Sequence, residues 1–196
     1  MQQVFTAYGI GQGANQPGHF VFCPLCGTRL ALEQKGGRQR PACPKCGFVQ
    51  YRNPVPGVVV VIEREGAVLL GKRRAGFGAG KWGLPQGYVE FDEDYLTAAI
   101  REVKEETGLD VEIRTILNVV SNLLSPELHT LGIVLLAGIV GGELRAGDDL
   151  EALQWVPLTG PLPEMAFEAD EQVIERYLTT KLGGGLPVYP GHVLGG

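Results

Sequence analysis

Residues 87–109 read GYVEFDEDYLTAAIREVKEETGL, and this stretch combines the pattern of an amphipathic helix with an unusual number of carboxylates. Four apolar residues recur at the spacing of one helix face, namely Leu96, Ala99, Ile100 and Val103. We expect Asp92 to cap this helix, because short acidic side chains accept hydrogen bonds from the first free N–H groups. Gly108 is expected to end it, because glycine readily adopts the left-handed conformation that follows many helices.

Three carboxylates of this helix, Glu102, Glu105 and Glu106, share one face beside the apolar stripe. Like charges at this spacing destabilise a helix by about a few tenths of a kcal/mol per pair. A solvated acidic face is the ordinary meaning of such a run, and a site for divalent cations is the alternative. Carboxylate oxygens are the hard ligands that Mg²⁺ and Mn²⁺ prefer. The helix alone leaves both interpretations open.

The wider spacing of the stretch resembles the Nudix box, whose pattern is G, five residues, E, seven residues, R-E-aliphatic, one residue, E-E, one residue, G-aliphatic. Nine positions across 23 residues match it without a departure: Gly87, Glu93, Arg101, Glu102, Val103, Glu105, Glu106, Gly108 and Leu109. Residues 82–90, WGLPQGYVE, also look like the segment that precedes this box in the family. The resemblance covers residues 54–182 and implies an α/β fold, the Nudix α/β/α sandwich with a mixed sheet.

The resemblance also implies a reaction and a catalytic metal. Nudix hydrolases cleave a nucleoside diphosphate linked to another moiety, with divalent metals that neutralise charge on the phosphates. By this resemblance Glu102, Glu105 and Glu106 would hold Mg²⁺ or Mn²⁺, and Glu105 or Glu106 is our first choice for a metal-linked general base. Glu151 and Glu168 are less favoured candidates for the base, because a loop carboxylate and a carboxylate at a helix N-terminus are ordinary structural features.

The resemblance further assigns supporting roles within the site. Arg101 would pair with Glu93 and fix the preceding loop against the helix, which completes the catalytic set. Gly87 would let its backbone approach a metal or a phosphate. The substrate-binding set comprises Gly87, Arg73, Trp82 and Phe167. Four aromatic residues could stack on adenine, although core packing is their more common fate: Phe77, Trp82, Tyr88 and Phe167.

The expected substrate is ADP-ribose or FAD. The NADH pyrophosphatase branch of the family carries a downstream SQPWPFP stretch, whereas residues 118–128 read NVVSNLLSPEL here. ADP-ribose pyrophosphatases resemble one another in a proline shortly beyond the box, and Pro126 stands near that place, although a turn would also explain it. Residues 164–167, EMAF, look like the end segment of a plant-type branch that acts on FAD and ADP-ribose. Hydrolysis of NADH or another dinucleotide is the alternative.

Two copies of a cysteine motif lie upstream, at Cys23-Pro24-Leu25-Cys26-Gly27 and Cys43-Pro44-Lys45-Cys46-Gly47. Each Cys-x-x-Cys pair can chelate one ion, and the 16 residues between the motifs suit a short hairpin that closes a tetrahedral Cys₄ zinc site. Four protein ligands leave no open position for chemistry, so we expect a structural zinc ion. A redox dithiol is the alternative. With the Cys₄ segment, the chain resembles the Nudix hydrolases that carry an N-terminal zinc ribbon.

The domain organisation follows from composition and length. The 196 residues include 29 glycines and 13 prolines, yet 44% are hydrophobic, which is enough to bury a core. We expect residues 54–182 to form the hydrolase domain and residues 19–52 to form the zinc ribbon, with Asn53-Pro54-Val55-Pro56 as the boundary. The glycine-rich segments 1–18 and 183–196 are expected to be tails with little to bury.

Apolar runs predict the remaining elements of the larger domain. We expect strands at 57–63, 67–72, 111–121, 131–140 and 152–156, and a second helix at 168–181. The first two strands form a hairpin through Arg64-Glu65-Gly66. Adjacent strands are expected to be antiparallel, and the mixture of elements favours a sandwich around a mixed sheet over a regular βαβ repeat.

Charge is distributed unevenly between the two domains. Residues 19–52 carry six basic side chains and one acidic side chain, a sum of +5, whereas the whole chain carries −5. The acidic total argues against a nucleic-acid binder that uses its whole surface. The basic ribbon leaves two other interpretations: a regulator that binds nucleotide or RNA through the ribbon, and a ribbon used only for dimer contact. The intact glutamate set argues against a pure binder.

We expect a cytoplasmic homodimer that acts on a small nucleotide and has neither membrane nor nucleic acid as a partner. The longest apolar run, Leu131–Val140, has ten residues, and about 20 are needed to span a bilayer. Met1–Ile10 lacks the basic and then apolar pattern of a secretory signal. A reducing compartment favours metal binding over disulfides for the four cysteines.

Overall fold

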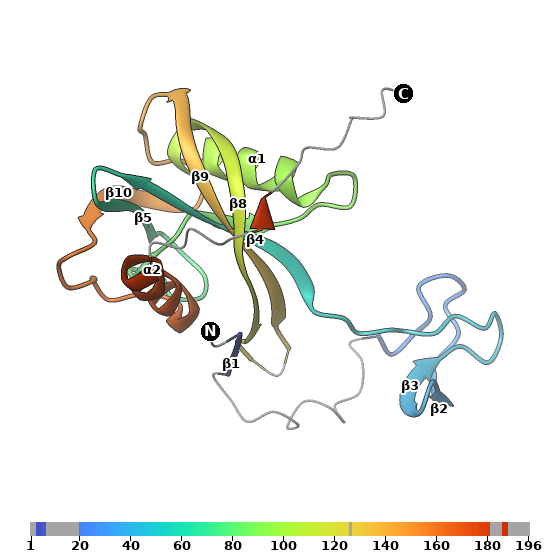
Figure 1. Ribbon diagram of the computed structural model, residues 1–196. Helices are drawn as coiled ribbons and strands as arrows, with labels where there is room; N and C mark the ends of the chain where they lie inside the picture. Colours follow the sequence, from blue (N-terminus) through green and yellow to red (C-terminus); the bar gives the residue numbers. More distant parts are fainter. Residues whose placement is uncertain (1–2, 7–19, 126, 181–185, 188–196) are drawn as a thin grey trace. The chain divides into compact units, whose positions relative to one another are not determined.

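The computed structural model describes residues 3–6, 20–125, 127–180 and 186–187, and Figure 1 shows its elements. The chain divides into two compact units. The larger unit comprises Met1–Phe5, Val55–Asn122 and Thr130–Gly196, and the smaller comprises Thr6–Pro54 and Leu123–His129. Most of the two expected tails lies outside the described residues, as does Pro126.

A nine-stranded sheet organises the larger unit, with the main order β1-β8-β9-β4-β5-β10. The strands of this path are β1 (Val4–Thr6), β4 (Val55–Arg64), β5 (Ala67–Arg73), β8 (Leu109–Leu123), β9 (His129–Gly142) and β10 (Leu150–Pro157). Three short strands lie off this path: β6 (Trp82–Gly83) pairs with β5, β7 (Gln86–Tyr88) pairs with β4, and β11 (Leu186–Pro187) pairs with β8.

The sheet is mixed, as expected. β4 is antiparallel to β5 and β7, and β10 is antiparallel to β5. The expectation that adjacent strands are antiparallel is wrong for β4 and β9, which run parallel from Val55↔Thr130 to Ile62↔Ala137. The expectation came from strands that follow one another in the chain, whereas β4 and β9 are separated by several elements.

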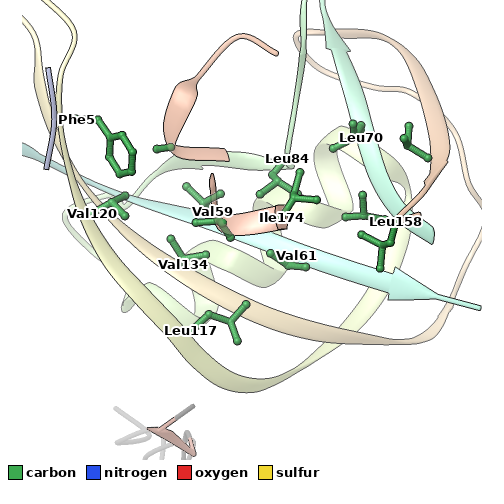
Figure 2. Packing of buried hydrophobic residues seen from close by; sticks show 14 residues of the cluster. Phe5, Val59, Val61, Leu70, Leu84, Leu117, Val120, Val134, Leu158 and Ile174 are labelled. Carbon is green, nitrogen blue, oxygen red and sulfur yellow. The ribbon is translucent and has the colours of Figure 1, made fainter. Parts of the chain in front are cut away.

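Two helices cover opposite faces of the sheet and produce the expected sandwich: α1 (Tyr95–Thr107) and α2 (Glu168–Thr180). Side chains of β4 alternate between these faces because successive residues of a strand point in opposite directions. Val59 belongs to the core cluster that includes Ile174 of α2 (Figure 2). Val60 belongs to the other cluster, which includes Val103 of α1. Within the described residues, neither helix is long and apolar enough to cross a membrane.

The N-terminal strand corrects one expectation. Phe5 in β1 is 6% exposed and belongs to the core cluster on the α2 side (Figure 2). The backbone N–H of Ser121 in β8 donates to the Gln3 carbonyl at 2.8 Å. The expectation that residues 1–18 have little to bury is therefore wrong for Phe5. Three residues are too few to show strand periodicity, so no local pattern predicts β1.

The start of α1 differs from the expectation, whereas its end agrees with it. Asp94, and not Asp92, caps the helix, because its carboxylate accepts from the backbone N–H groups of Leu96 and Thr97 at 2.8 and 3.1 Å. Three acidic residues stand in succession here, and composition alone does not distinguish which one adopts the capping conformation. Gly108 has φ 73° and ends the helix in the left-handed conformation.

Asp170, in the first turn of α2, supports the loop between β6 and β7. Its buried carboxylate accepts a hydrogen bond from Leu84 N at 3.0 Å. Burial raises the pKa of Asp170 to about 7, although the Leu84 bond and the charge of Arg73 act in the opposite direction. The carboxyl group of Asp170 has a pKa of about 4 in the unfolded chain. The folded chain therefore keeps this proton at pH values where the unfolded chain has lost it.

The sign of the effect on stability follows from this difference in pKa. The stabilisation by the bound proton is complete below the unfolded pKa and is lost as the pH rises through about 7. Asp170→Asn stays neutral and can still accept from Leu84 N. We expect it to raise Tm over wild type by about 2–4 °C at pH 8.5, and by less at pH 5, in scanning calorimetry. An equal shift at both pH values would contradict this account.

The smaller unit is built around the hairpin of β2 (Ala31–Lys35) and β3 (Arg38–Ala42), which pair in register from Ala31↔Ala42 to Lys35↔Arg38. This hairpin lies between the two cysteine motifs, as expected from their spacing. Gly36 and Gly37 at its turn have φ 57° and 76°, and positive φ at both central residues is the geometry that closes a tight hairpin.

Candidate functional site

Helix α1 carries the three predicted metal ligands at different depths. Glu106 and Glu102 are buried, with exposed fractions of 2% and 8%, whereas half of the Glu105 side chain is exposed. The helix lies against β4 and β7, so the two buried carboxylates are enclosed between the helix and the sheet. Solvent reaches mainly the third.

Arg101 connects two of the three carboxylates, those of Glu102 and Glu105, to the preceding loop. Its Nε and Nη2 donate to the two oxygens of Glu93 at 3.0 and 2.6 Å. Its Nη1 donates to Glu102 at 2.9 Å and to Glu105 at 3.0 Å, and its Nη2 also donates to the Tyr88 carbonyl at 3.1 Å. Hydrogen bonding by Arg101 lowers the pKa of Glu93. The bidentate pair thus fixes the loop against α1, which is the arrangement expected for these two residues.

Gly87 is a glycine because the carboxylate of Glu102 occupies the space of a side chain. A Cβ built on Gly87 would lie 2.0 Å from Cδ of Glu102 and 2.1 and 2.2 Å from its two oxygens. Real Cβ atoms do not approach other heavy atoms so closely. The β7 backbone at Gly87 and the Glu102 carboxylate are therefore in direct contact.

Burial raises the pKa of both enclosed carboxyl groups. The pKa of Glu106 rises to about 9, mainly by desolvation, with smaller contributions from the charges of Asp149 and Glu102. One bond opposes this rise, from Gln86 N to Glu106 Oε2 at 2.9 Å. The pKa of Glu102 is also raised by burial, against the opposing effect of Arg101. A bound divalent cation would reverse these shifts, because it supplies the positive charge that the enclosed oxygens lack.

The loop between β9 and β10 brings an acidic residue to this site that the sequence reasoning missed. Gly147 N donates to the Glu106 carbonyl at 3.0 Å, and Arg145 N donates to the Thr107 carbonyl at 2.9 Å. These bonds hold the loop against the C-terminal end of α1. The charge of Asp149, two residues beyond Gly147, contributes to the raised pKa of Glu106. The only signal for Asp149 was the short acidic run GDDLE at 147–151.

The two less favoured candidates for the base have other partners. Glu151 forms an ion pair with Lys72 at 2.7 Å. Glu168 begins α2 and accepts from Gln172 Nε2 at 3.2 Å. Neither contact brings these carboxylates to the α1 cluster.

The predicted substrate residues form two groups. Phe167 stacks on Phe77, with ring centroids 5.4 Å apart and an interplanar angle of 25°, and the Arg73 guanidinium lies 5.6 Å from the Phe167 centroid. Phe77 is 46% exposed. Trp82 is partly buried and packs against the core cluster on the α2 side. Phe77 is thus accessible from solvent, whereas the indole of Trp82 contributes to packing.

The four cysteines of the smaller unit form a cluster with the geometry of a metal site. Their Sγ atoms all lie within 4.8 Å of one another. Gly27 N and Gly47 N donate to the carbonyls of Cys23 and Cys43 at 2.9 and 3.0 Å, which closes each knuckle. Both glycines have positive φ, 68° and 78°. Four thiols gathered in this way match a tetrahedral structural zinc site.

Comparison with known families identifies the chain. Residues 52–177 match the NUDIX domain, and residues 21–52 match the Nudix N-terminal zinc ribbon. The chain belongs to the Nudix family. The Cys₄ cluster is accordingly that of a Nudix zinc ribbon, and Nudix hydrolases use Mg²⁺ or Mn²⁺.

Several Nudix proteins resemble the chain over most of its length. An "ADP-ribose pyrophosphatase" of Methanocaldococcus jannaschii is 37% identical over 167 residues, which cover 83% of this chain and 97% of that protein. A "NAD-capped RNA hydrolase NudC" of Pseudomonas aeruginosa is 33% identical over 176 residues, but these cover 88% of this chain and 61% of that protein. The chain therefore spans about three-fifths of the NudC relative.

The fold of the chain also matches solved Nudix structures. A crystal structure of a Nudix hydrolase from Nitrosomonas europaea superposes with a TM-score of 0.72 at 28% identity and covers 87% of this chain and 97% of that one. A MutT Nudix hydrolase from Burkholderia pseudomallei superposes with a TM-score of 0.59 at 34% identity and covers 63% of this chain and 98% of that one. The first match extends beyond the Nudix domain, because it covers most of the chain.

Proposed function

We propose that this Nudix protein hydrolyses the pyrophosphate of ADP-ribose to two monophosphates in the presence of Mg²⁺ or Mn²⁺. The proposal depends on the packing of Gly87 against Glu102, together with the bidentate ion pair between Arg101 and Glu93. These contacts hold in place a cluster of carboxylates, which are the ligands that hard cations prefer. The relative of matching length named as an ADP-ribose pyrophosphatase supports the choice of substrate.

We assign roles to the residues of this cluster from their burial and bonds. Glu102 and Glu106 would hold the metal, because burial leaves their carboxylates with little solvent. Glu105 would contribute to the same site and accept the proton of the attacking water, because solvent reaches its side chain. Arg101 and Glu93 would hold these carboxylates in their positions. When bound, the divalent cation neutralises charge on the phosphates.

The adenine ring and the phosphates of the substrate would contact the segments around β6. We assign Phe167, backed by Phe77, to contact the adenine ring, because the pair lies partly exposed beside Arg73. Trp82 would support this contact from the core, since its carbonyl accepts from Ala166 N at 2.7 Å. Gly87 would face the phosphates with its backbone.

Product analysis over a substrate panel tests the proposal. Purified enzyme with Mg²⁺ would be given ADP-ribose, FAD, NADH and an NAD-capped RNA, and products would be separated by liquid chromatography. We expect the highest kcat/KM for ADP-ribose, with AMP and ribose 5-phosphate as products. A higher kcat/KM for any other member of the panel, or the absence of hydrolysis, would overturn the choice of substrate.

A second candidate is the hydrolysis of a dinucleotide cap on RNA. The relatives named NudC favour it, and so does the ribbon, where Arg40 lies 4.8 Å above the exposed ring of Tyr51. Paired cations and aromatic rings are typical of surfaces that bind single strands. If this candidate is right, capped RNA should exceed NADH in kcat/KM, and Tyr51→Ala should reduce that advantage.

We propose further that the enzyme is a cytoplasmic homodimer. Four reduced cysteines that share a metal are expected in a reducing compartment. Light scattering coupled to gel filtration, with and without a zinc chelator, would establish the oligomeric state and any role of the ribbon in it. A monomer mass under both conditions would contradict the dimer.

Replacement of Gly87 tests the packing on which the proposal depends. Gly87→Ala would place a methyl group on the Glu102 carboxylate, so the carboxylate must move. Since small displacements of a catalytic group are costly, we expect kcat/KM to fall about 10- to 100-fold. Gly160→Ala, whose added Cβ would meet only the Pro157 carbonyl oxygen at an ordinary contact distance of 3.7 Å, controls for loss of a glycine. Equal activity in both variants would contradict the account.

A further inference from the structure

Arg73 holds three protein groups at once, although the resemblance assigned it to the substrate. Its Nε donates to the Phe77 carbonyl at 2.9 Å, and its Nη2 donates to Asp149 Oδ2 at 3.2 Å. Its guanidinium also lies near the Phe167 ring. Only 15% of the side chain is exposed. A guanidinium engaged in this way is suited to fixing other residues in place.

On one side Arg73 secures the segments that carry the aromatic pair. Gly80 N donates to the Arg73 carbonyl at 2.8 Å, which closes the loop that contains Phe77 against the end of β5. A Cβ on Gly78 would lie 2.5 Å from Cβ of Ala166. The Phe77 loop and the segment before α2 are therefore in close contact, and a shift of one would move the other.

On the other side Arg73 secures the loop that faces the metal ligands. The backbone N–H of Arg74 donates to the Asp149 carbonyl at 2.7 Å, so backbone and side chain of Asp149 are both bound at the end of β5. The loop that carries Asp149 is bound to Glu106, because Gly147 N donates to the Glu106 carbonyl at 3.0 Å. The charge of Asp149 also contributes to the raised pKa of Glu106. Its Oδ1 is buried and accepts no hydrogen bond within the described residues. Arg73 is thus the group that determines where this carboxylate stands.

We propose that Arg73 is a positioning residue that sets the Asp149 carboxylate against Glu106 and ties the placement of the Phe77–Phe167 pair to the metal-binding face of α1. The inference deepens the proposed function and rests on it. A planar guanidinium can donate from two edges to two loops at once. A lysine keeps the charge but offers a single ammonium group, which cannot reproduce both bonds with the same geometry.

Mn²⁺ binding without substrate is the decisive measurement, with free Mn²⁺ followed by electron paramagnetic resonance. Arg73→Lys keeps the charge, so long-range attraction of the cation is unchanged. Because outer groups that orient metal ligands control affinity, we expect about 10-fold weaker Mn²⁺ binding. Arg64→Gln is the matched control, since Arg64 also packs over an aromatic ring, 4.4 Å from the Trp155 centroid. Unchanged affinity in Arg73→Lys would overturn the proposal, since an arginine that contacts only substrate would leave Mn²⁺ binding as it is.

A double-mutant cycle tests whether Arg73 acts through Asp149. Asp149→Asn alone should weaken Mn²⁺ binding, and Arg73→Lys should have little further effect in its presence. Additive losses would overturn the proposal. Should Arg73→Lys not fold, unchanged Mn²⁺ affinity in Asp149→Asn would overturn it by itself.

The kinetic constants provide a further test that separates positioning from stacking. Phe77→Leu keeps the backbone carbonyl that Arg73 binds, so it should raise KM and leave Mn²⁺ affinity unchanged. Arg73→Lys should lower kcat and also raise KM. If wild type hydrolyses nothing in the panel, the proposed function fails, whereas the Mn²⁺ measurements still decide the role of Arg73.

Discussion

Glu106→Gln is expected to abolish most turnover and to leave the fold intact. The amide matches the carboxylate in shape and can accept the bond from Gln86 N, but it carries no charge to bind a cation. Divalent metals contribute several kcal/mol in such sites, so we expect kcat/KM to fall by at least about 100-fold. Glu105→Gln is expected to lower kcat by a similar factor, because it removes the proposed base.

The same variant has a distinctive effect on stability. Burial raises the pKa of Glu106 to about 9, which means that the enclosed carboxylate is costly when no cation is bound. Glu106→Gln removes this cost. We therefore expect its Tm in a chelator to equal or exceed that of wild type, whereas the rise in Tm that Mg²⁺ gives to wild type should disappear.

Glu112→Gln provides the matched control for both measurements, because Glu112 is exposed on β8. It should retain wild-type activity and the Mg²⁺-dependent rise in Tm. Full activity in Glu106→Gln would refute the assignment of the metal site to α1. A large loss of Tm in chelator would instead indicate that Glu106 is needed for folding.

Loss of zinc is expected to unfold the smaller unit and to spare the larger one. Among the described residues of the ribbon, only Cys23, Ala42 and Cys43 are buried, so the hairpin of β2 and β3 has almost no core. Structural zinc contributes about 10–16 kcal/mol in comparable small domains. The sheet of the larger unit has two extensive clusters of its own.

Hydrogen exchange followed by mass spectrometry can test this separation. We expect Cys43→Ser to lose bound zinc, measured by elemental analysis, and to lose protection in β2 and β3. Protection in β4 and α1 should persist. Gln34→Ala, an exposed change in β2, should keep both zinc and protection. Persistent protection of the hairpin after zinc removal would show that the ribbon has another source of stability.

Local patterns predicted the parts of the site that lie close together in the sequence. The helix, its glycine stop and the glutamate face come from one stretch, and the cysteine knuckles come from two short motifs. The pair of Arg101 with Glu93 was expected only from the resemblance to the Nudix family, although the two residues lie eight positions apart at the start of the helix. In each case a few neighbouring residues determine the geometry.

Residues placed by tertiary contacts had no comparable pattern. Asp149 reaches Glu106 only because backbone bonds fasten its loop to the end of α1, and no spacing in the sequence encodes those bonds. Phe5 pairs with a strand more than a hundred residues away. Asp94, and not Asp92, caps α1, while Arg101 binds Glu93 between them, and the sequence has no pattern that distinguishes the two aspartates.

The alternation of β4 between two cores has a consequence for folding kinetics. Val58–Val61 are four identical residues, so a slip of one position would exchange the two faces yet present the same side chains to each. The valines therefore cannot select the register by themselves. The register of β4 must therefore be determined at the two ends of the strand. One end is the Glu65–Gly66 turn, and the other is Gly57, where a Cβ would lie 2.9 Å from the Gly87 carbonyl oxygen. Chains that pair too early would be trapped out of register, with Gly87 displaced from Glu102, until these two ends correct them.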